Sequence, residues 1–218
     1  MRCDDGDMQT LHNGSGDTEY MVISHSQMTH FSTQDRNLTN LKDLYISNTN
    51  IEQITITSDL VNQKQVTIVY NKRLRHENIV IQAPNLKELN IRNNNLSNIP
   101  TLNTRKLEEL VISENHVVHF DSKINYFPVV RRLILKNNPL IKFQAAEGLS
   151  SLEHLDLENT KVTRFNSSEL DIPNLRELIL SGNDLESIDL ETPLLNLTKL
   201  KCDHANLTRM NTSLFIPP

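Results

Sequence analysis

The sequence contains no Trp, only five Gly and only two Cys among its 218 residues. Neither a Gly-rich phosphate loop nor a Gly-rich nucleotide-binding turn is present, so these common phosphate-binding motifs are excluded. No apolar run approaches the roughly 20 residues that a membrane-spanning helix needs. We therefore expect no membrane span in this segment and no bound cofactor.

Basic residues are scarce relative to acidic ones. The chain has 22 Lys and Arg against 27 Asp and Glu, which gives a formal net charge of −5. Nucleic-acid binding requires a basic stripe that neutralises phosphate groups, so we expect no nucleic-acid partner. With 37% apolar residues, the composition is that of a soluble globular protein with enough material for one extended core.

The two cysteines, Cys3 and Cys202, are too few to indicate a cellular compartment. If the chain is built of rungs stacked roughly 4.8 Å apart, the two lie much farther apart than the roughly 7 Å between Cα atoms that a disulfide allows. We therefore expect no bond between them. Cys202 occupies a core position of the repeat described next, so we expect it to be buried.

One short pattern occurs three times between residues 130 and 188. The copies read VRRLILKNNPLIKF, LEHLDLENTKVTRF and LRELILSGNDLESI, beginning at Val130, Leu152 and Leu175. With the first residue counted as offset 1, apolar residues occupy offsets 1, 4, 6, 11 and 14, and Asn138, Thr160 and Asn183 occupy offset 9. Offsets 4 and 6 alternate with polar residues, which predicts the inward side of a short strand. The offset 9 side chain is expected to turn inward and bond to backbone groups at the bend.

The pattern extends over most of the chain. Repeats start near residues 18, 41, 63, 86, 107, 130, 152, 175 and 197, at intervals of 21 to 23 residues. In the third copy Arg73 stands where an apolar residue is expected. We therefore expect an irregular turn between Tyr70 and Ile81, with Leu74 taking the apolar place. The Ala-Ala-Glu-Gly-Leu run predicts one helical turn over residues 144–149.

A single copy cannot bury its apolar face, whereas stacked copies can. We therefore predict an α/β repeat solenoid of about nine repeats, mostly strands joined by irregular turns. Residues 1–17 would form a partial N-terminal cap and residues 18–218 the solenoid. Pro217 stands two residues before a further repeat start, as earlier prolines do, and no polar cap follows Met210. We expect a solenoid truncated at the C-terminus, in a fragment of a longer protein.

Over residues 18–218 the pattern resembles extracellular leucine-rich repeat proteins of the type with about 22 to 24 residues per repeat. The Asn-rich, Gly-poor and Cys-poor repeats look most like secreted insect immune leucine-rich repeat proteins and Toll-like receptor ectodomains. The resemblance implies a right-handed horseshoe with a parallel sheet on its concave face, which binds macromolecules without catalysis. The pattern is specific for the fold but gives almost no information about the ligand.

Acceptors for N-linked glycans indicate an extracellular protein independently, although roughly four would arise by chance. They are Asn13, Asn37, Asn95, Asn166, Asn196, Asn206 and Asn211. Asn95 and Asn206 share offset 10, which points away from the core, and Asn166 and Asn211 share offset 15 in the outer turn. Glycans fit sterically at these places. An intracellular leucine-rich repeat protein stays the alternative.

Side chains that point outward from the strands, at offsets 2, 3, 5, 7 and 8, form the candidate partner-binding surface. The candidate residues are Tyr20, Val22, Tyr45, Val69, Tyr70, Val111, Arg131, Ile134, Lys136 and Asp156. Exposed aromatic clusters on a rigid sheet are good interface anchors, which favours the first three repeats. Val111 and Ile134 belong to a weaker second patch that Asp156 interrupts.

Charges alternate along the same surface. Offset 2 reads Lys87, Glu108, Arg131, Glu153 and Arg176 on successive rungs. Opposite charges side by side on a sheet contribute about 0.2–1 kcal/mol per pair. Two interpretations stay open here: a surface whose charges satisfy one another, or a banded surface that a charged partner recognises.

No set of catalytic or metal-binding residues stands out. His116 and His119 come nearest to a metal pair, but they lie at offsets 10 and 13 with no third ligand nearby in the sequence. We predict a non-enzymatic module that binds a protein or glycan on the concave face, in innate immunity or receptor signalling. The alternative is an intracellular adaptor or regulatory subunit that docks on a partner protein. A homodimer or heterodimer could form through a C-terminal region beyond this sequence.

Overall fold

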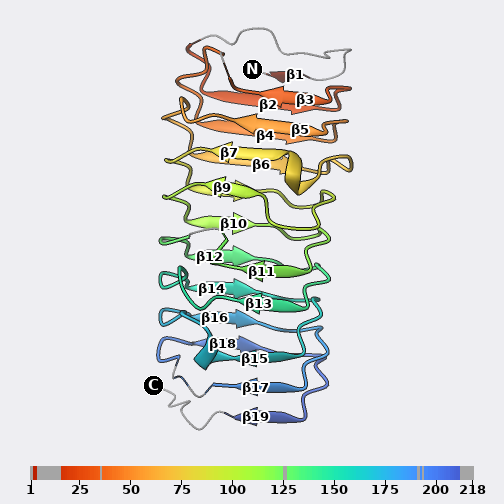
Figure 1. Cartoon of the computed structure of the whole chain (residues 1–218), viewed down its shortest axis with the longest axis vertical. Coiled ribbons are helices and arrows are strands. Elements are labelled where there is room, and N and C mark those ends of the chain that lie inside the picture. The colour runs from red at the N-terminus through yellow and green to blue at the C-terminus, as the bar shows by residue number, and fades with distance from the viewer. Residues whose placement is uncertain are drawn as a thin grey trace. The chain divides into compact units, whose positions relative to one another are not determined.

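The computed structural model describes residues 2–3, 16–34, 36–124, 127–190, 192 and 194–211. The chain forms two compact units, residues 1–107 (unit 1) and residues 108–218 (unit 2). Within each unit, short strands stack side by side and the chain returns between them through turns (Figure 1). Asn13 and most of the expected cap over residues 1–17 lie outside the described residues.

The main sheet of unit 1 is parallel, with the strand order β1, β2, β4, β6, β8. These strands are Arg2–Cys3 (β1), Tyr20–Ser24 (β2), Asp43–Ser47 (β4), Gln65–Val69 (β6) and Glu88–Asn90 (β8). A second parallel sheet follows on the return path, in the order β3, β5, β7, β9. Its strands are His30–Ser32 (β3), Gln53–Ile56 (β5), Ile79–Gln82 (β7) and Thr101–Asn103 (β9). A 3₁₀ helix, η1 (His76–Asn78), precedes β7.

Unit 2 repeats this arrangement, with a parallel main sheet in the order β10, β12, β14, β16, β18. These strands are Glu109–Val111 (β10), Arg132–Ile134 (β12), His154–Asp156 (β14), Glu177–Ile179 (β16) and Lys199–Lys201 (β18). On the return path β11 pairs with β13, and β17 lies between β15 and β19. Their bounds are His119–Asp121 (β11), Lys142–Gln144 (β13), Arg164–Asn166 (β15), Ser187–Asp189 (β17) and Arg209–Asn211 (β19). The 3₁₀ helix η2 (Ser167–Glu169) follows β15.

The apolar pattern of the repeats sets the core of both units. Side chains at offsets 4 and 6 are buried, as Met21 and Ile23 illustrate in unit 1 and Leu155 and Leu157 in unit 2. Because successive residues of a strand face opposite sides, the residues between them point away from the core. We call this side of each main sheet the outward face. The predicted fold class, a repeat solenoid built mostly of parallel strands, is confirmed.

Buried amide side chains at offset 9 connect successive turns, as the sequence predicts. The Oδ1 atom of Asn183 accepts a hydrogen bond from the backbone N–H of Thr160 at 2.9 Å. Its Nδ2 donates to the carbonyl groups of Leu157 at 2.7 Å and Leu180 at 2.8 Å. Asn138 bonds to backbone groups in the same way in the same unit. These amides satisfy backbone groups that the bend after each strand would otherwise leave unpaired.

Each repeat bends after its strand through a residue with left-handed backbone at offset 8. These residues are His25, Asn48, Tyr70, Asn93, Glu114, Asn137, Asn159, Gly182 and His204, with φ between 50° and 70°. Gly and Asn adopt this conformation readily, whereas Tyr or Glu there is strained by about 1–2 kcal/mol. A Cβ at Gly182 would stand 2.0 Å from Oδ1 of Asn159, so a side chain here would have to displace the exposed side chain of Asn159.

The third repeat departs from the pattern where the sequence predicts an irregular turn. Leu74 is buried and Arg73 is exposed, as expected, and η1 follows them. Gln63 occupies offset 1 in place of an apolar residue and is buried. Its Nε2 donates to the carbonyl groups of Lys42 and Gln65, both at 2.9 Å. Its Oε1 has no hydrogen-bond partner among the described residues, so this repeat carries a polar defect in its core.

The helical turn predicted over residues 144–149 is wrong. Residues 142–144 form β13, and residues 146–148 form a bend in which Gly148 has a φ of 82°. Because this φ is incompatible with a right-handed helix, Gly148 prevents a helical turn. The 3₁₀ helix of unit 2 lies at η2 instead, where Asn166 Oδ1 accepts a hydrogen bond from the backbone N–H of Ser168 at 3.0 Å.

The prediction that Cys202 is buried is confirmed only in part. It is half-buried and forms no disulfide. Leu200, two residues earlier at offset 4, is half-buried as well. Within the described residues this repeat has a neighbouring strand on one side only, β16. Leu178 in β16 has neighbouring strands on both sides and is fully buried.

Candidate functional site

A hollow of about 500 Å³ opens on the outward face of unit 1, over β2 and β4. It is lined by Tyr20, Val22, Ser24, His25, Tyr45, Ser47 and Asn48. The parallel register places Val22 beside Tyr45 and Ser24 beside Ser47, so equal offsets of two successive repeats lie side by side. The structure therefore brings three of the predicted binding residues together, Tyr20, Val22 and Tyr45.

The lining of this hollow is aromatic and uncharged. Tyr20 is 54% exposed, and Val22 and Tyr45 are half-buried. No Asp, Glu, Lys or Arg is among the described residues that line it. Tyr combines a large apolar ring with a polar hydroxyl group, which suits a surface that is partly wet and partly covered by a ligand.

Tyr70 follows β6 on the same face and is held by Arg92. Its hydroxyl oxygen accepts a hydrogen bond from Nη2 of Arg92 at 2.9 Å, and the guanidinium carbon lies 5.5 Å from the ring centroid. A cation–π contact at an exposed site contributes about 0.5–1 kcal/mol. This contact offsets part of the strain of the left-handed backbone at Tyr70. The sequence indicated Tyr70 but gave no sign of Arg92 as its partner.

Two predicted binding residues are buried, which corrects the sequence-based assignment. Val69 is 3% exposed and Asp156 is 6% exposed. Val69 is paired with Ser47, and Asp156 stands between Ile134 and Ile179. Val69 is at offset 7, directly before the bend, where Ser47 and Ser113 are buried as well. Asp156 is flanked by longer side chains on strands about 4.8 Å away, which cover it. Neither residue offers much surface to a partner.

The second predicted patch, on unit 2, is small. Val111 and Ile134 are neighbours in β10 and β12, and both are half-buried. Arg131 and Lys136, the remaining predicted binding residues, are engaged in ion pairs on the same face. Apolar surface on unit 2 is therefore limited and is bordered by paired charges.

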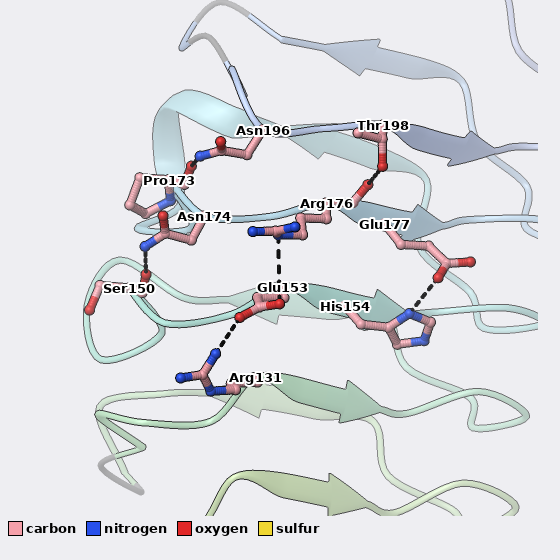
Figure 2. Close-up of polar contacts among 10 residues, drawn as sticks. All are labelled: Arg131, Ser150, Glu153, His154, Pro173, Asn174, Arg176, Glu177, Asn196 and Thr198. Carbon is pink, nitrogen blue, oxygen red and sulfur yellow. Dashed lines mark hydrogen bonds and ion pairs between the residues drawn. The ribbon is translucent and has the colours of Figure 1, made fainter.

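The charges on the outward face of unit 2 pair with one another (Figure 2). Glu153 accepts a hydrogen bond from Nη1 of Arg131 at 2.6 Å, and its other oxygen lies 3.6 Å from Nε of Arg176. Further ion pairs join Arg132 to Glu109 at 3.2 Å and Lys136 to Glu158 at 3.9 Å. Such exposed pairs contribute about 0–1 kcal/mol each. The contacts favour the first interpretation of the alternating charges, a surface that satisfies itself.

A second row of amide side chains, which the sequence analysis missed, lies one residue before the repeat starts. Nδ2 of Asn174 donates to the carbonyl of Ser150 at 2.7 Å, and Nδ2 of Asn196 donates to the carbonyl of Pro173 at 3.1 Å (Figure 2). In unit 1 the same bond is made by Asn40, Asn62 and Asn85. The recurrence of Asn directly before the start of a repeat was the available signal.

A comparison with known families agrees with this geometry. Residues 85–104 match the Leucine Rich Repeat family. No curated protein matches the sequence. The leucine-rich repeat fold nevertheless extends over most of the chain, because solved leucine-rich repeat structures superpose on both units.

Three solved structures illustrate the similarity. A leucine-rich repeat protein of Leptospira interrogans has 23% identity and a TM-score of 0.70, covering 88% of this chain and 50% of its own. YopM from Yersinia enterocolitica has 20% identity and a TM-score of 0.68, covering 88% of this chain and 39% of its own. FLRT2, in a complex with Latrophilin 3 and Unc5D, has 16% identity and a TM-score of 0.69, covering 94% and 74%. The chain spans half or less of the two bacterial proteins, and at these identities the likeness establishes the fold alone.

Three titratable side chains form a row across β14, β16 and β18 of unit 2. Nδ1 of His154 lies 2.8 Å from Oε2 of Glu177, and Nζ of Lys199 donates to the other oxygen of the same carboxylate. The hydrogen bond from Lys199 lowers the pKa of Glu177, partial burial opposes this effect, and His154 adds to it. Figure 2 shows the contact between His154 and Glu177.

We expect acid destabilisation of the protein to weaken in the variant Glu177→Gln. A carboxylate whose pKa is lowered by folding stabilises the folded state above its ordinary pKa of about 4.3, and this contribution is lost as the pH falls through the lower folded value. Urea unfolding measured between neutral and strongly acidic pH would reveal a shallower loss for Glu177→Gln. Lys199→Met, which removes the main cause of the shift, should flatten the loss in the same direction. Identical acid profiles for the wild type and Glu177→Gln would contradict this account.

The glycan acceptors differ in accessibility. Asn37, Asn196 and Asn206 are exposed, and Asn95, Asn166 and Asn211 are half-buried. Asn166 caps η2, and Asn196 belongs to the row of amides one residue before the repeat starts. Asn196 thus combines an exposed acceptor with a bond between turns.

Metal-binding clusters and membrane-spanning helices would both bear on function. Among the described residues, no group of three or more His, Cys, Asp or Glu side chains is placed to hold a metal ion, and His116 and His119 are both exposed. In the part of the chain that the structure describes, no helix is long and apolar enough to span a bilayer. The hollow over β2 and β4 is the candidate site that combines aromatic rings with an uncharged lining.

Proposed function

We propose that the chain is a non-enzymatic recognition module that binds a macromolecule through the outward face of unit 1. The observation that carries this proposal is the hollow over β2 and β4, where the rings of exposed Tyr20 and half-buried Tyr45 lie together in an uncharged lining. On unit 2, a partner would first have to displace ion pairs such as those between Glu153 and its two arginines. The Tyr-rich face is the better candidate for this reason.

The physics of interfaces supports this choice. Binding energy in protein complexes concentrates in a few buried anchors, among which Tyr and Arg are enriched. Tyr20, Tyr45 and the Tyr70–Arg92 pair supply such side chains on one sheet. Because the backbone beneath them is held by parallel strand pairing, little ordering is needed on binding, and less of the interaction energy is lost.

Comparison with other leucine-rich repeat proteins also supports a binding role. FLRT2 forms part of an octameric complex with Latrophilin 3 and Unc5D. By analogy, we propose that this chain binds a partner without catalysing a reaction, as an extracellular module in innate immunity or receptor signalling. The extracellular part of the proposal is supported by the seven acceptors, of which Asn37, Asn196 and Asn206 are exposed.

The double variant Tyr20→Ala/Tyr45→Ala is expected to weaken partner binding by about 100-fold or more. Each hot-spot aromatic contributes about 2 kcal/mol, and tenfold in affinity corresponds to about 1.4 kcal/mol. The partner would be isolated by photo-cross-linking from position 20, and its affinity measured by calorimetry. Ile134→Ala/Ile179→Ala, which truncates outward residues at offset 5 of unit 2, is the matched control and should leave affinity unchanged. Equal affinity of the wild type and the double Tyr variant would remove this face from consideration.

Expression in secretory cells tests the extracellular part of the proposal. We expect a stepwise loss of mass on endoglycosidase treatment, with single Asn→Gln changes at Asn37, Asn196 and Asn206 each removing one glycan because these side chains are exposed. Mass spectrometry of the intact protein measures the outcome. An unchanged mass at every acceptor would favour the intracellular adaptor instead.

A further inference from the structure

Polar groups that have no partner in the protein line the hollow over β2 and β4. The hydroxyl group of Ser47 has no hydrogen bond to any described residue and keeps access to solvent at the hollow. The side chains of His25, Tyr45 and Asn48 likewise make no hydrogen bond or ion pair within the described part of the chain. Because these groups face the open hollow, a bound ligand can supply the hydrogen-bond partners that the protein does not. We take this cluster as the mark of a site that a ligand completes.

Part of the outward surface of unit 2 differs from this cluster. Several outward polar side chains there bond to one another, as Arg131 does to Glu153 and Asn159 to Asn137, whereas Ser113, at the offset of Ser47, makes no side-chain hydrogen bond among the described residues. In the hollow, by contrast, hydroxyl, amide and imidazole groups surround two Tyr rings and one Val, and none of the lining residues is acidic or a Lys or Arg. A charged ligand would find no opposite charge in this lining, whereas a neutral ligand rich in hydrogen-bonding groups would find donors and acceptors.

We propose that the hollow binds a neutral saccharide, presented either by a free polysaccharide or by a glycan on a partner protein. The ligand class follows from the two kinds of side chain in the lining, the Tyr rings and the hydrogen-bonding groups. The faces of Tyr20 and Tyr45 pack against the apolar C–H surface of a sugar ring, and its hydroxyl groups bond to Ser47, Asn48 and His25. An aliphatic or aromatic protein side chain in the same place would leave the hydroxyl of Ser47 desolvated without a partner. The hollow of about 500 Å³ is within the usual size of small-ligand sites. The inference rests on the proposed function and names the ligand of the same site.

The test uses neutral trisaccharides of glucose, mannose and N-acetylglucosamine as probes, with a sulfated trisaccharide as the charged comparison. We expect at least one neutral probe to bind with a Kd of about 1 mM, as is typical of small polar ligands on open sites. Amide chemical-shift changes should centre on residues 22–25 and 45–48. Tyr45→Ala should weaken binding at least about tenfold, and Ser47→Ala and Tyr45→Phe about threefold each, through loss of the ring or of one hydrogen bond. Ile179→Ala and Ser113→Ala, at the same offsets on unit 2, are the matched controls and should bind as the wild type does.

The source of the saccharide is decided with larger ligands. Binding of a neutral polysaccharide of the preferred sugar indicates a free glycan, whereas a cross-linked partner that loses affinity after enzymatic deglycosylation indicates a glycoprotein. Three results would overturn the inference: no neutral trisaccharide bound at about 10 mM, binding unaffected by Tyr45→Ala, or binding of the sulfated probe alone. If a fully deglycosylated partner still binds and Tyr20→Ala/Tyr45→Ala still abolishes that binding, the saccharide inference fails while the proposed function stands.

Discussion

The variant Leu155→Asp is expected to lower the free energy of unfolding by about 4 kcal/mol or more. Leu155 is 0% exposed and lies in β14 between Leu133 of β12 and Leu178 of β16. A carboxylate there would stand between two leucine side chains with no hydrogen-bond donor in place of water. It would either stay charged at a large desolvation cost or take up a proton. Urea unfolding followed by circular dichroism measures the loss.

The neighbouring residue provides the comparison for this variant. Asp156 follows Leu155 and faces the other side of the sheet, where the substitution of a fully exposed residue would be nearly neutral. Its Oδ1, however, accepts a hydrogen bond from the backbone N–H of Glu158 at 3.0 Å, and the residue is nearly buried. We therefore expect Asp156→Ala to lower the stability by about 1 kcal/mol. Equal losses for Leu155→Asp and Asp156→Ala would mean that the inward and outward faces are wrongly assigned.

Asn183→Ala is expected to be the second most damaging change, with a loss of about 3 kcal/mol or more. The amide accepts from both the N–H and the hydroxyl group of Thr160 and donates to the carbonyl groups of Leu157 and Leu180. Ala would leave these buried groups without their partner, in a place where Asn183 itself is almost inaccessible to water. Thermal unfolding and hydrogen exchange at Thr160 measure the effect.

Asn174→Ala is the matched control for this change. Nδ2 of Asn174 makes a single hydrogen bond, to the carbonyl of Ser150, and the residue is exposed. Because water can replace that bond, we expect a loss of no more than about 1 kcal/mol. A loss at Asn174 as large as that at Asn183 would show that both rows of amides stabilise the turns equally, against the argument from burial.

The sequence alone predicted the fold because a single pattern carried the information. Apolar residues at offsets 4 and 6 recur at nearly constant intervals, so residues such as Leu155 and Leu178 could be assigned to the core from the repeat alone. Asn138 and Asn183 could be assigned to inward hydrogen bonds for the same reason, since only a buried bend explains a polar residue at a fixed place in an apolar pattern.

Other features depend on neighbours that one repeat does not reveal. Val69 and Asp156 are at outward offsets, yet both are buried in the assembled sheet. The bend at Gly148 overrides a composition that favours a helix, because one backbone angle decides it. The hydrogen bonds of Asn174 and Asn196 between turns were not predicted, because Asn before a strand is also an ordinary turn residue.

The candidate site was predicted in part. The Tyr residues of β2 and β4 stood out in the sequence as aromatic side chains at outward offsets. Nothing in the sequence indicated that the side chains of Ser47, Asn48 and His25 would line the same hollow without hydrogen-bond partners among the described residues. Satisfaction of hydrogen bonds is a property of the assembled sheet, because it depends on which groups from other repeats come within reach.

The left-handed residue after each strand limits how freely this surface can diversify. A library that randomised offset 8 would lose many members to misfolding, because β-branched residues are poorly tolerated at positive φ. Offsets 3 and 5 carry ordinary strand backbone, so they can vary without such a penalty. Engineering new specificity into this scaffold should therefore diversify the strands and keep Asn, Gly or His at the bends.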